Sequence, residues 1–171
     1  MPDIVPNGHA PDSFDDASNG ARSLAQLGTF LQNDGWFPQP ITAADGYRAL
    51  YAGDNGEFRC LALIRTDLEQ MLFYAVAPVR VVAESRLAVA EYITRANYGL
   101  RIGNFELDFS DGEVRYKSSI DFEGEPLTSN LIRNTIYPAV KLLDTYLPGL
   151  MKVAFGGMEP VVAIAEIEGE H

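Results

Sequence analysis

The sequence predicts a single α+β domain in which an antiparallel sheet packs against helices. Three observations lead to this fold class. Several segments alternate apolar and polar residues, as strands do, and short turns rich in Gly and Asp separate them. Other segments repeat apolar residues at helical spacing. Along the 171 residues the order is helix, three strands, helix, two strands, helix, which is enough chain for one substantial core.

The first helix is predicted from about residue 21, because Leu24, Leu27, Phe30 and Leu31 share one helical face. It is expected to stop at the Asn-Asp-Gly stretch of residues 33–35. Trp36 and Phe37, which follow, are expected to cover the edge of the core.

Three strands are predicted next, at residues 46–52, 57–65 and 70–76, with Pro78 ending the third. Unlike ordinary half-buried strands, they are apolar on both faces, so the second face needs a cover. The apolar residues of that second face are Leu50, Leu61, Leu63, Leu72, Tyr74 and Val76.

Several kinds of cover for this second face are open at this point, a small hydrophobic ligand among them. The chain itself can supply it, through its N-terminal segment, through Trp36–Phe37 or through its C-terminal segment. A second copy of the chain or a protein partner can also supply it. The residues predicted to bind such a partner are the apolar centre of the face and the two arginines that frame it, namely Leu61, Leu63, Leu72, Tyr74, Arg59 and Arg65.

A second helix is predicted from about residue 82 or 84 to residue 97, with Leu87, Ala90, Ile93, Thr94 and Asn97 as its inward stripe and Gly99 as a left-handed C-terminal cap. A hairpin follows at 105–122. Asp111-Gly112 lies between two alternating runs and predicts a two-residue turn. That turn would place Asp108 opposite Arg115 and Glu106 opposite Lys117.

The last long helix is predicted to start at Thr128 or Ser129, with a kink at Pro138 and a sharper break at Pro148. Its inward stripe keeps helical spacing throughout: Ile132, Ile136, Val140, Leu143, Leu147 and Leu150. A short final helix is expected to begin with Pro160, with Val161, Ile164 and Ile167 facing inward.

The residues that catalysis or metal binding needs are scarce. The two histidines, His9 and His171, lie in the terminal segments, so no Ser-His-acid or Cys-His arrangement can form within the body of the domain. Cys60 alternates with Phe58 and Ala62 and is predicted to be a buried, inert thiol. We therefore predict no catalytic, metal-binding or cofactor-binding residue and no cofactor.

The net charge of −11 is concentrated at the ends of the chain. Residues 1–20 hold four Asp, residues 159–171 hold four Glu, and neither segment has Lys or Arg. We expect residues 1–20 to form an acidic flexible tail and residues 21–171 to form the domain. Acidic ends argue against nucleic acid as a partner, and no apolar run is long enough for a membrane span. The single cysteine and the lack of a cationic, apolar leader predict a cytoplasmic protein.

The order of elements, together with AEYITRANYGLRIGNFELDFSDGEVRY at 90–116, resembles the YbjN-like family of bacterial proteins. The segment RANYGLRIGNFELD is the most telling, because a helix end there runs straight into a strand. The resemblance covers about residues 21–168 and implies a fold like that of the type III secretion chaperones. Family members are labelled sensory transduction regulators, with no common enzymatic activity. The matching residues imply a fold and no site: Asn97, Tyr98, Gly99, Gly103, Asn104, Phe105 and Glu106.

From these observations we expect a non-enzymatic protein-binding module, chaperone-like or regulatory, that acts through its apolar sheet face or through a dimer seam. One alternative is a small-molecule sensor with an apolar pocket between the sheet and the helices. A third is an enzyme of unknown reaction, which the lack of histidine in the body disfavours.

Overall fold

The computed structural model describes residues 17–169. These residues form one mixed sheet-and-helix body with a short 3₁₀ turn, η1 (Ala83–Ser85). The helices are α1 (Asn19–Asn33), α2 (Arg86–Gly99), α3 (Ser129–Gly156) and α4 (Pro160–Glu168). The strands are β1 (Gln39–Pro40), β2 (Gly46–Ala52), β3 (Glu57–Arg65), β4 (Gln70–Arg80), β5 (Asn104–Leu107) and β6 (Glu113–Asp121). The predicted α+β order is confirmed, with a two-residue β1 added before the first predicted strand. Residues 1–16 and 170–171 lie outside the described part. Most of the predicted tail, residues 1–20, therefore lies outside it as well.

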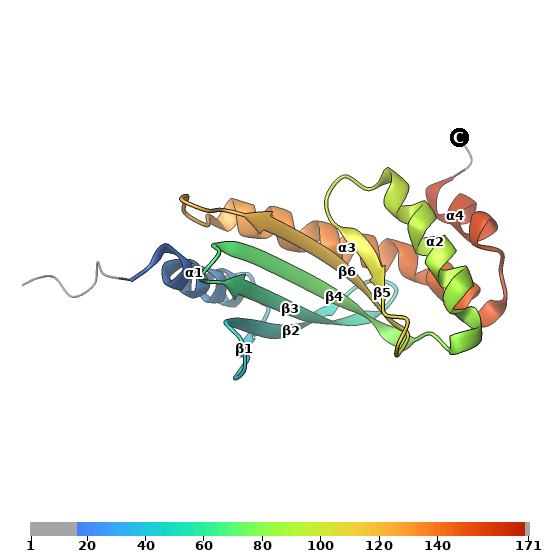
Figure 1. The fold of residues 1–171 in the computed structure, drawn as a ribbon, viewed down its shortest axis with the longest axis horizontal. Coiled ribbons are helices and arrows are strands. Elements are labelled where there is room, and N and C mark those ends of the chain that lie inside the picture. Colours follow the sequence, from blue (N-terminus) through green and yellow to red (C-terminus); the bar gives the residue numbers. More distant parts are fainter. Residues whose placement is uncertain (1–16, 170–171) are drawn as a thin grey trace, which may run out of the picture.

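The described sheet has six strands in the order β1-β2-β3-β4-β6-β5, and every neighbouring pair is antiparallel. Strands β1 to β4 follow one another as a meander. The chain then leaves through α2, returns as β5 at the edge, and places β6 between β5 and β4 (Figure 1). The sheet is therefore built from local hairpins and one long excursion.

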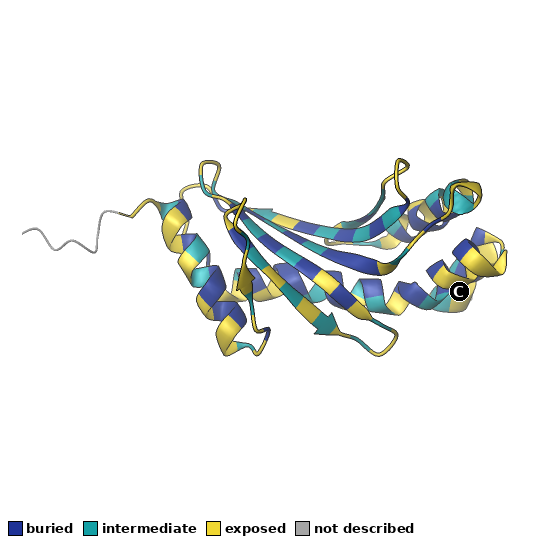
Figure 2. Ribbon diagram, turned by 90° about the horizontal axis from the view of Figure 1, so that it is seen from below, coloured by how far each residue is buried: buried dark blue, intermediate teal, exposed yellow. Residues whose placement is uncertain are grey.

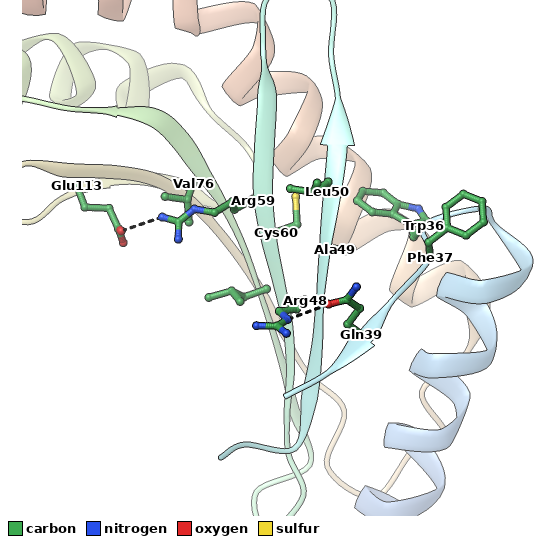
Figure 3. Close-up of a pocket in the computed structure, with 12 residues that line it drawn as sticks. Trp36, Phe37, Gln39, Arg48, Ala49, Leu50, Arg59, Cys60, Val76 and Glu113 are labelled. Atoms are coloured by element: carbon green, nitrogen blue, oxygen red, sulfur yellow. Dashed lines mark hydrogen bonds and ion pairs between the residues drawn. The ribbon is translucent and has the colours of Figure 1, made fainter. Parts of the chain in front are cut away.

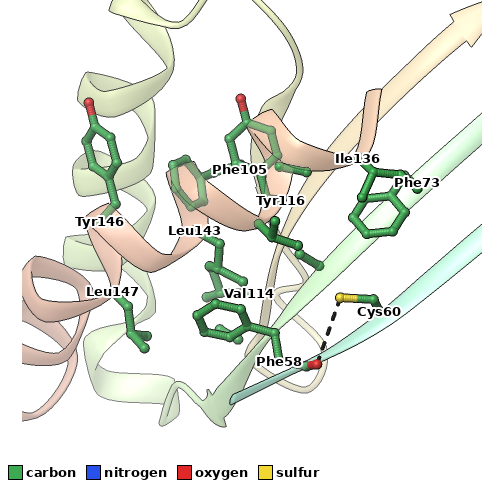
Figure 4. Packing of buried hydrophobic residues seen from close by; sticks show 14 of the residues in the cluster. Phe58, Cys60, Phe73, Phe105, Val114, Tyr116, Ile136, Leu143, Tyr146 and Leu147 are labelled. Carbon is green, nitrogen blue, oxygen red and sulfur yellow. Dashed lines mark hydrogen bonds between the residues drawn. The ribbon is translucent and has the colours of Figure 1, made fainter. Parts of the chain in front are cut away.

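The helices cover one face of the sheet. In Figure 1 the sheet lies towards the reader, with α1 and α3 behind it and α2 and α4 beyond its β5 end. The strands alternate between buried and more exposed residues along their length (Figure 2). Side chains from the helix-facing side of the strands meet those of α3 in the core, where Phe58, Phe73, Val114, Ile136 and Leu143 pack together (Figure 4). The face of the sheet opposite the helices is thereby left as a separate surface.

Helix α3 continues past Pro148, so the predicted break there is wrong. A proline removes the hydrogen bond to the carbonyl four residues earlier, which here belongs to Asp144. The side-chain amide of Asn55, in the β2–β3 turn, donates to that carbonyl oxygen at 3.1 Å. The Asp144 carboxylate also accepts from the backbone N–H groups of Asp54 and Asn55 at 3.0 and 2.8 Å. The turn thus takes over the carbonyl that Pro148 leaves free. All six residues of the predicted α3 stripe are buried.

Strand β4 also continues beyond the proline that was predicted to end it, Pro78. It runs to Arg80 and not to Val76, and its pairing with β6 shifts register between these two residues. Proline is accepted inside a sheet where a bulge interrupts the ladder, which is why Pro78 does not end the strand.

Helix α2 turns a different face inward from the one predicted. Its buried residues are Val89, Tyr92, Ile93 and Ala96, whereas Leu87 is 77% exposed and Thr94 is exposed. Of the five predicted inward residues, only Ile93 is buried, while the fully buried Tyr92 points into the core.

The hydroxyl of Tyr92 donates to the carbonyl of Tyr146 on α3 at 2.8 Å, and this bond fixes the rotation of α2 against α3. Gly99 is the last residue of the helix and is not left-handed. The glycine with positive φ lies further on, at Gly103. In α4, Pro160 is the first residue as predicted, and Pro160 and Ala163 are its buried residues. Of the three predicted inward residues, Val161 faces solvent, and Ile164 and Ile167 are half-buried.

The β5–β6 hairpin has a register two residues away from the predicted one. Glu106 lies opposite Arg115, and Leu107 lies opposite Val114, so the predicted Asp108–Arg115 and Glu106–Lys117 pairs are wrong. Since the shift is even, every strand residue keeps its predicted face. Phe109, which was predicted to lie in the strand and face the core, instead lies in the turn and is 51% exposed.

The turn chemistry explains this register. A two-residue type I′ turn needs positive φ at both central residues, but Asp111 does not have it and Gly112 does, at 77°. The Asp108 carboxylate instead accepts from the Ser110 backbone N–H at 2.7 Å and from its hydroxyl at 2.6 Å. The side chain of Asp108 therefore closes a longer turn of residues 109–112 and is withdrawn from cross-strand pairing.

Candidate functional site

The candidate site is the sheet face that points away from the helices, which we call the outer face. The strand register places every predicted partner-binding residue on it, together with Leu50 and Val76. It also brings in three cations, on β2 and β6, that were not predicted to join them. The outer face includes Arg48, Leu50, Arg59, Leu61, Leu63, Arg65, Leu72, Tyr74, Val76, Arg115 and Lys117, and the carboxylates Glu106, Glu113 and Asp121 lie at its borders.

Rows of side chains cross the outer face from strand to strand. One row reads Leu50, Arg59, Val76, Arg115, Glu106. The next row reads Arg48, Leu61, Tyr74, Lys117, Asn104. A third row pairs Leu63 with Leu72. The apolar residues are therefore contiguous over β2, β3 and β4, with cations at their borders.

No residue among those described covers this apolar surface. Leu50 is 58% exposed, while Leu61, Leu63, Leu72 and Tyr74 are half-buried by their neighbours in the sheet. Val76 is buried, between Arg59 and Arg115 on the two neighbouring strands. Two of the proposed covers are ruled out. Trp36 is buried on the helix side, and the C-terminal helix α4 packs on α2 and α3.

The charges on the β6 side of the outer face are satisfied locally. The Glu106 carboxylate bonds to Arg115 at 2.7 Å and to Lys117 at 2.6 Å. Although burial raises the pKa of Glu106, hydrogen bonds from Lys117 and Arg115 and their positive charges bring it below its usual value. The Arg115 guanidinium also lies 4.3 Å from the centre of the Tyr74 ring.

The arginines on the β2–β3 side are only loosely paired. Arg48 donates to the Gln39 amide oxygen at 3.3 Å, an uncharged partner. Arg59 lies 3.9 Å from Glu113, and Arg65 lies 3.6 Å from Asp67. With side chains 69% and 57% exposed, Arg59 and Arg65 gain little from these pairs. They remain available to an incoming anion.

A depression of about 690 Å³ opens on this same side of the outer face. Leu50, Leu61 and Val76 line it together with Arg48 and Arg59, and the chain segment before β1 forms its far wall (Figure 3). On that wall Phe37 is 87% exposed and has a positive φ of 49°, which is uncommon for a bulky residue. The prediction that Phe37 covers the core edge is wrong, since it borders the depression instead.

A polar cluster at the end of α1 holds this wall in place. The Asp34 carboxylate accepts from the indole N–H of Trp36 at 3.1 Å, from the Tyr137 hydroxyl at 2.7 Å and from Arg133 at 3.1 Å. Burial raises the pKa of Asp34, but these hydrogen bonds and the Arg133 charge outweigh it and lower the pKa. The Trp36 ring stacks on Tyr51 at 5.3 Å. The segment before β1 is thus anchored to α3 and to β2.

The alternative of an apolar pocket between the sheet and the helices stays a prediction. Core side chains from both layers pack together in the region shown in Figure 4, and the depression is lined by outer-face residues of β2 and β3 and also by Trp36, Ala49 and Cys60. Sequence reasoning missed Arg48 as part of the site, although it shares strand parity with Leu50 in GYRALYA. It paired Arg115 and Lys117 with carboxylates of the hairpin and did not connect them to the neighbouring apolar strands.

A second apolar surface lies at the helical end of the molecule. It consists of exposed side chains around the α3–α4 junction: Met151, Phe155, Val161 and Val162. The cation beside it, Lys152, is already paired with Glu166 of α4 at 2.5 Å. It is the main rival to the outer face as a binding surface.

Residues 17–169 contain no histidine and no group of three or more His, Cys, Asp or Glu side chains that could hold a metal ion. Within the same range, no helix has both the length and the apolar character needed to cross a membrane.

Cys60 is buried as predicted, and it should be unreactive in the native protein. Its side chain is 1% exposed, and burial raises the pKa of its thiol to about 12. Since the thiolate is the reactive form, we expect no labelling by iodoacetamide at pH 8 in buffer and complete labelling in denaturant, as measured by mass spectrometry. Labelling of the native chain at the rate of a free thiol would contradict this burial.

Comparisons with known proteins agree with the geometry. A search among curated proteins finds no match. Among solved structures, one described as "Crystal structure of YbjN, a putative transcription regulator from E. coli" has the same fold. Its TM-score is 0.55 at 15% sequence identity, and the match covers 78% of this chain and 90% of that one. The shared fold is therefore that of an α+β domain with an antiparallel sheet.

The sequence also matches a family model over residues 23–151, from within α1 to the last two turns of α3. The chain belongs to the YbjN family, which is described as "Putative bacterial sensory transduction regulator". The resemblance drawn from the sequence is confirmed. The description is that of a regulator and names no reaction.

Proposed function

We propose that this chain is a non-enzymatic protein-binding module of the bacterial cytoplasm, chaperone-like or regulatory, whose binding surface is the outer face. The observation that carries the proposal is the contiguous apolar surface of Leu61, Leu63, Leu72 and Tyr74, which no described residue covers. Monomeric proteins rarely leave large contiguous apolar patches facing water unless the patch binds something. The family description as a regulator supports a binding role.

The composition of the outer face suits a protein ligand. Protein interfaces combine an apolar centre with a polar rim and are enriched in Tyr and Arg, which matches Tyr74 within a rim of arginines. Burial of the apolar centre would provide the driving force at about 25 cal/mol per Å². The exposed arginines would give orientation and specificity.

The test compares two leucine-to-glutamate variants. Leu63→Glu places a carboxylate in the centre of the outer face, whereas Leu87→Glu places one on an exposed site of α2. Each purified, immobilised chain is exposed to a native bacterial extract. We expect one set of proteins to be retained by wild type and Leu87→Glu and lost from Leu63→Glu. Equal retention by all three chains would overturn the proposal.

The stability of Leu63→Glu separates a binding face from a structural one. Because no described residue lies over Leu63, its replacement should lower the free energy of unfolding by no more than about 1–2 kcal/mol. A carboxylate buried under another segment would cost several kcal/mol more. Denaturant unfolding measures this difference.

Sedimentation of the same variant separates a dimer seam from a surface for another protein. A wild-type dimer that becomes a folded monomer on Leu63→Glu would identify the face as a seam between copies. Unchanged sedimentation together with loss of retained proteins would identify it as a surface for a different partner.

A further inference from the structure

We propose that the N-terminal segment of this chain, residues 1–16, docks on the outer face and competes there with the protein partner. This inference rests on the proposed function and names a regulator of the same surface. It follows from the charge of the outer face, the composition of the segment and the point at which the segment joins the fold.

The charge of the outer face favours an acidic occupant. Its two central rows hold Arg48, Arg59, Arg115 and Lys117 against Glu106, and Glu113 lies at their border, 3.9 Å from Arg59. This cationic surface belongs to a chain with a net charge of −11. Glu106 already bonds to Arg115 and Lys117, so the arginines of β2 and β3 are the ones left for a ligand.

Residues 1–16 have the complementary composition. They contain four aspartates, Asp3, Asp12, Asp15 and Asp16, and no Lys or Arg. Five apolar side chains accompany them: Met1, Ile4, Val5, Ala10 and Phe14. Acidic residues interspersed with apolar ones are what a surface of leucines bordered by arginines would bind.

The segment joins the fold beside the outer face. Helix α1 starts against the β3–β4 turn, where the Asn19 side-chain amide donates to Glu69 at 2.8 Å. A Cβ on Gly20 would lie closer than 3.0 Å to the Thr66 backbone, so the fit is tight. The strands that this turn connects carry Arg65, Leu63 and Leu72 on the outer face. The segment thus begins at one end of the apolar surface.

The length of the segment is sufficient to cross the face. Sixteen residues in extended form reach about 53 Å at ~3.3 Å per residue, whereas the nine residues of β3 rise only about 30 Å. The chain can pass round the β3–β4 turn and still reach the depression beside Leu50 and Leu61. A tethered segment also acts at millimolar effective concentration, so weak contacts suffice for docking.

A second copy of the chain fits the outer face less well. Face-to-face packing of two outer faces would bring one cationic set against another, and like charges at close range oppose association. An acidic segment removes this repulsion. Docking of residues 1–16 would therefore also keep apolar outer faces from pairing.

A cross-linker placed in the segment tests the docking in the full chain. Ser13→Cys adds a thiol between Asp12 and Phe14, and the buried Cys60 should not compete for a thiol-directed photo-cross-linker. We expect cross-links within one chain to peptides of residues 57–80. They should be lost with Leu63→Glu, retained with Leu87→Glu, and weakened at about 1 M salt, where the Debye length is ~3 Å.

Other cross-linking results would overturn the proposal. Links confined to helix peptides would show that the segment does not occupy the outer face. Links between two chains, identified by mixing isotope-labelled and unlabelled protein, would show that the segment acts on a second copy.

Partner retention provides a second readout and separates this inference from the proposed function. Asn in place of Asp12, Asp15 and Asp16 should increase the amount of partner retained by the immobilised chain, because the competitor is weakened. Unchanged retention in this variant would overturn the competition. If retention by the Asn variant is unchanged while Leu63→Glu still loses the partner, the proposal that residues 1–16 compete for the outer face is refuted and the proposed binding function is retained.

Discussion

Gly112→Ala should lower the free energy of unfolding by about 2–5 kcal/mol, although the residue lies in a surface turn. Two costs add at this position. Its φ of 77° is left-handed, which costs a non-glycine residue about 1–2 kcal/mol. A Cβ there would lie closer than 3.0 Å to backbone atoms of Val81, and forcing atoms into such a contact costs about 1–3 kcal/mol. The Val81 N–H also donates to the Gly112 carbonyl at 2.9 Å, so displacement would strain that bond.

Gly124→Ala is the matched control for this prediction. Gly124 has the same φ of 77°, but nothing lies within 4 Å of the position of its Cβ. It should therefore lose only the conformational part, about 1–2 kcal/mol. Urea unfolding of both variants measures the difference. Equal losses would mean that the β5–β6 turn does not pack against Val81 as described.

Leu143→Ala should lower the free energy of unfolding by about 2–5 kcal/mol, because it leaves a cavity at the centre of the core. Leu143 is 0% exposed and lies on α3 among core residues from the strands (Figure 4). The surrounding helix and sheet are closely packed and can close the cavity only in part.

Leu63→Ala is the comparison on the other side of the sheet. Leu63 is half-buried and lies under no described residue, so its removal leaves no enclosed cavity. Its loss should be less than half that of Leu143→Ala. Losses of equal size would contradict the division of the sheet into a core face and a binding face.

The alternation of residues was the most reliable guide to this fold. Strands β2 and β3 have the predicted bounds, and the two-faced apolar character of β3 and β4 led directly to the outer face. Alternation carries this information because neighbouring side chains of a strand point to opposite faces whatever the rest of the fold does. The stripe of α3 was predictable for the same reason, since its spacing is local.

The errors arose where a distant contact decided the structure. Nothing near Pro148 in the sequence indicates that Asn55 satisfies the carbonyl it leaves free. The rotation of α2 depends on a bond from Tyr92 to a residue 54 positions away. In the hairpin, the side chain of Asp108 competed with the strand pairing and set the register.

The site was predictable in part. The leucines of β3 and the arginines beside them were identified from the sequence, but Arg48 was not, because its place on the outer face depends on the pairing of β2 with β3. The depression depends on Phe37 and on the hydrogen bonds that anchor Trp36 before β1. These are tertiary features that no local pattern contains.

Hydroxyl-radical footprinting in the presence of a retained protein tests the central claim most directly. This measurement reports the solvent access of individual side chains, and the two apolar surfaces both contain reactive ones. We predict protection of Leu61, Leu63 and Tyr74 on the outer face, with no change at Met151 and Phe155 at the α3–α4 junction. Protection of Met151 and Phe155 with the outer face unchanged would contradict the account and would place the binding surface at the helical end of the molecule.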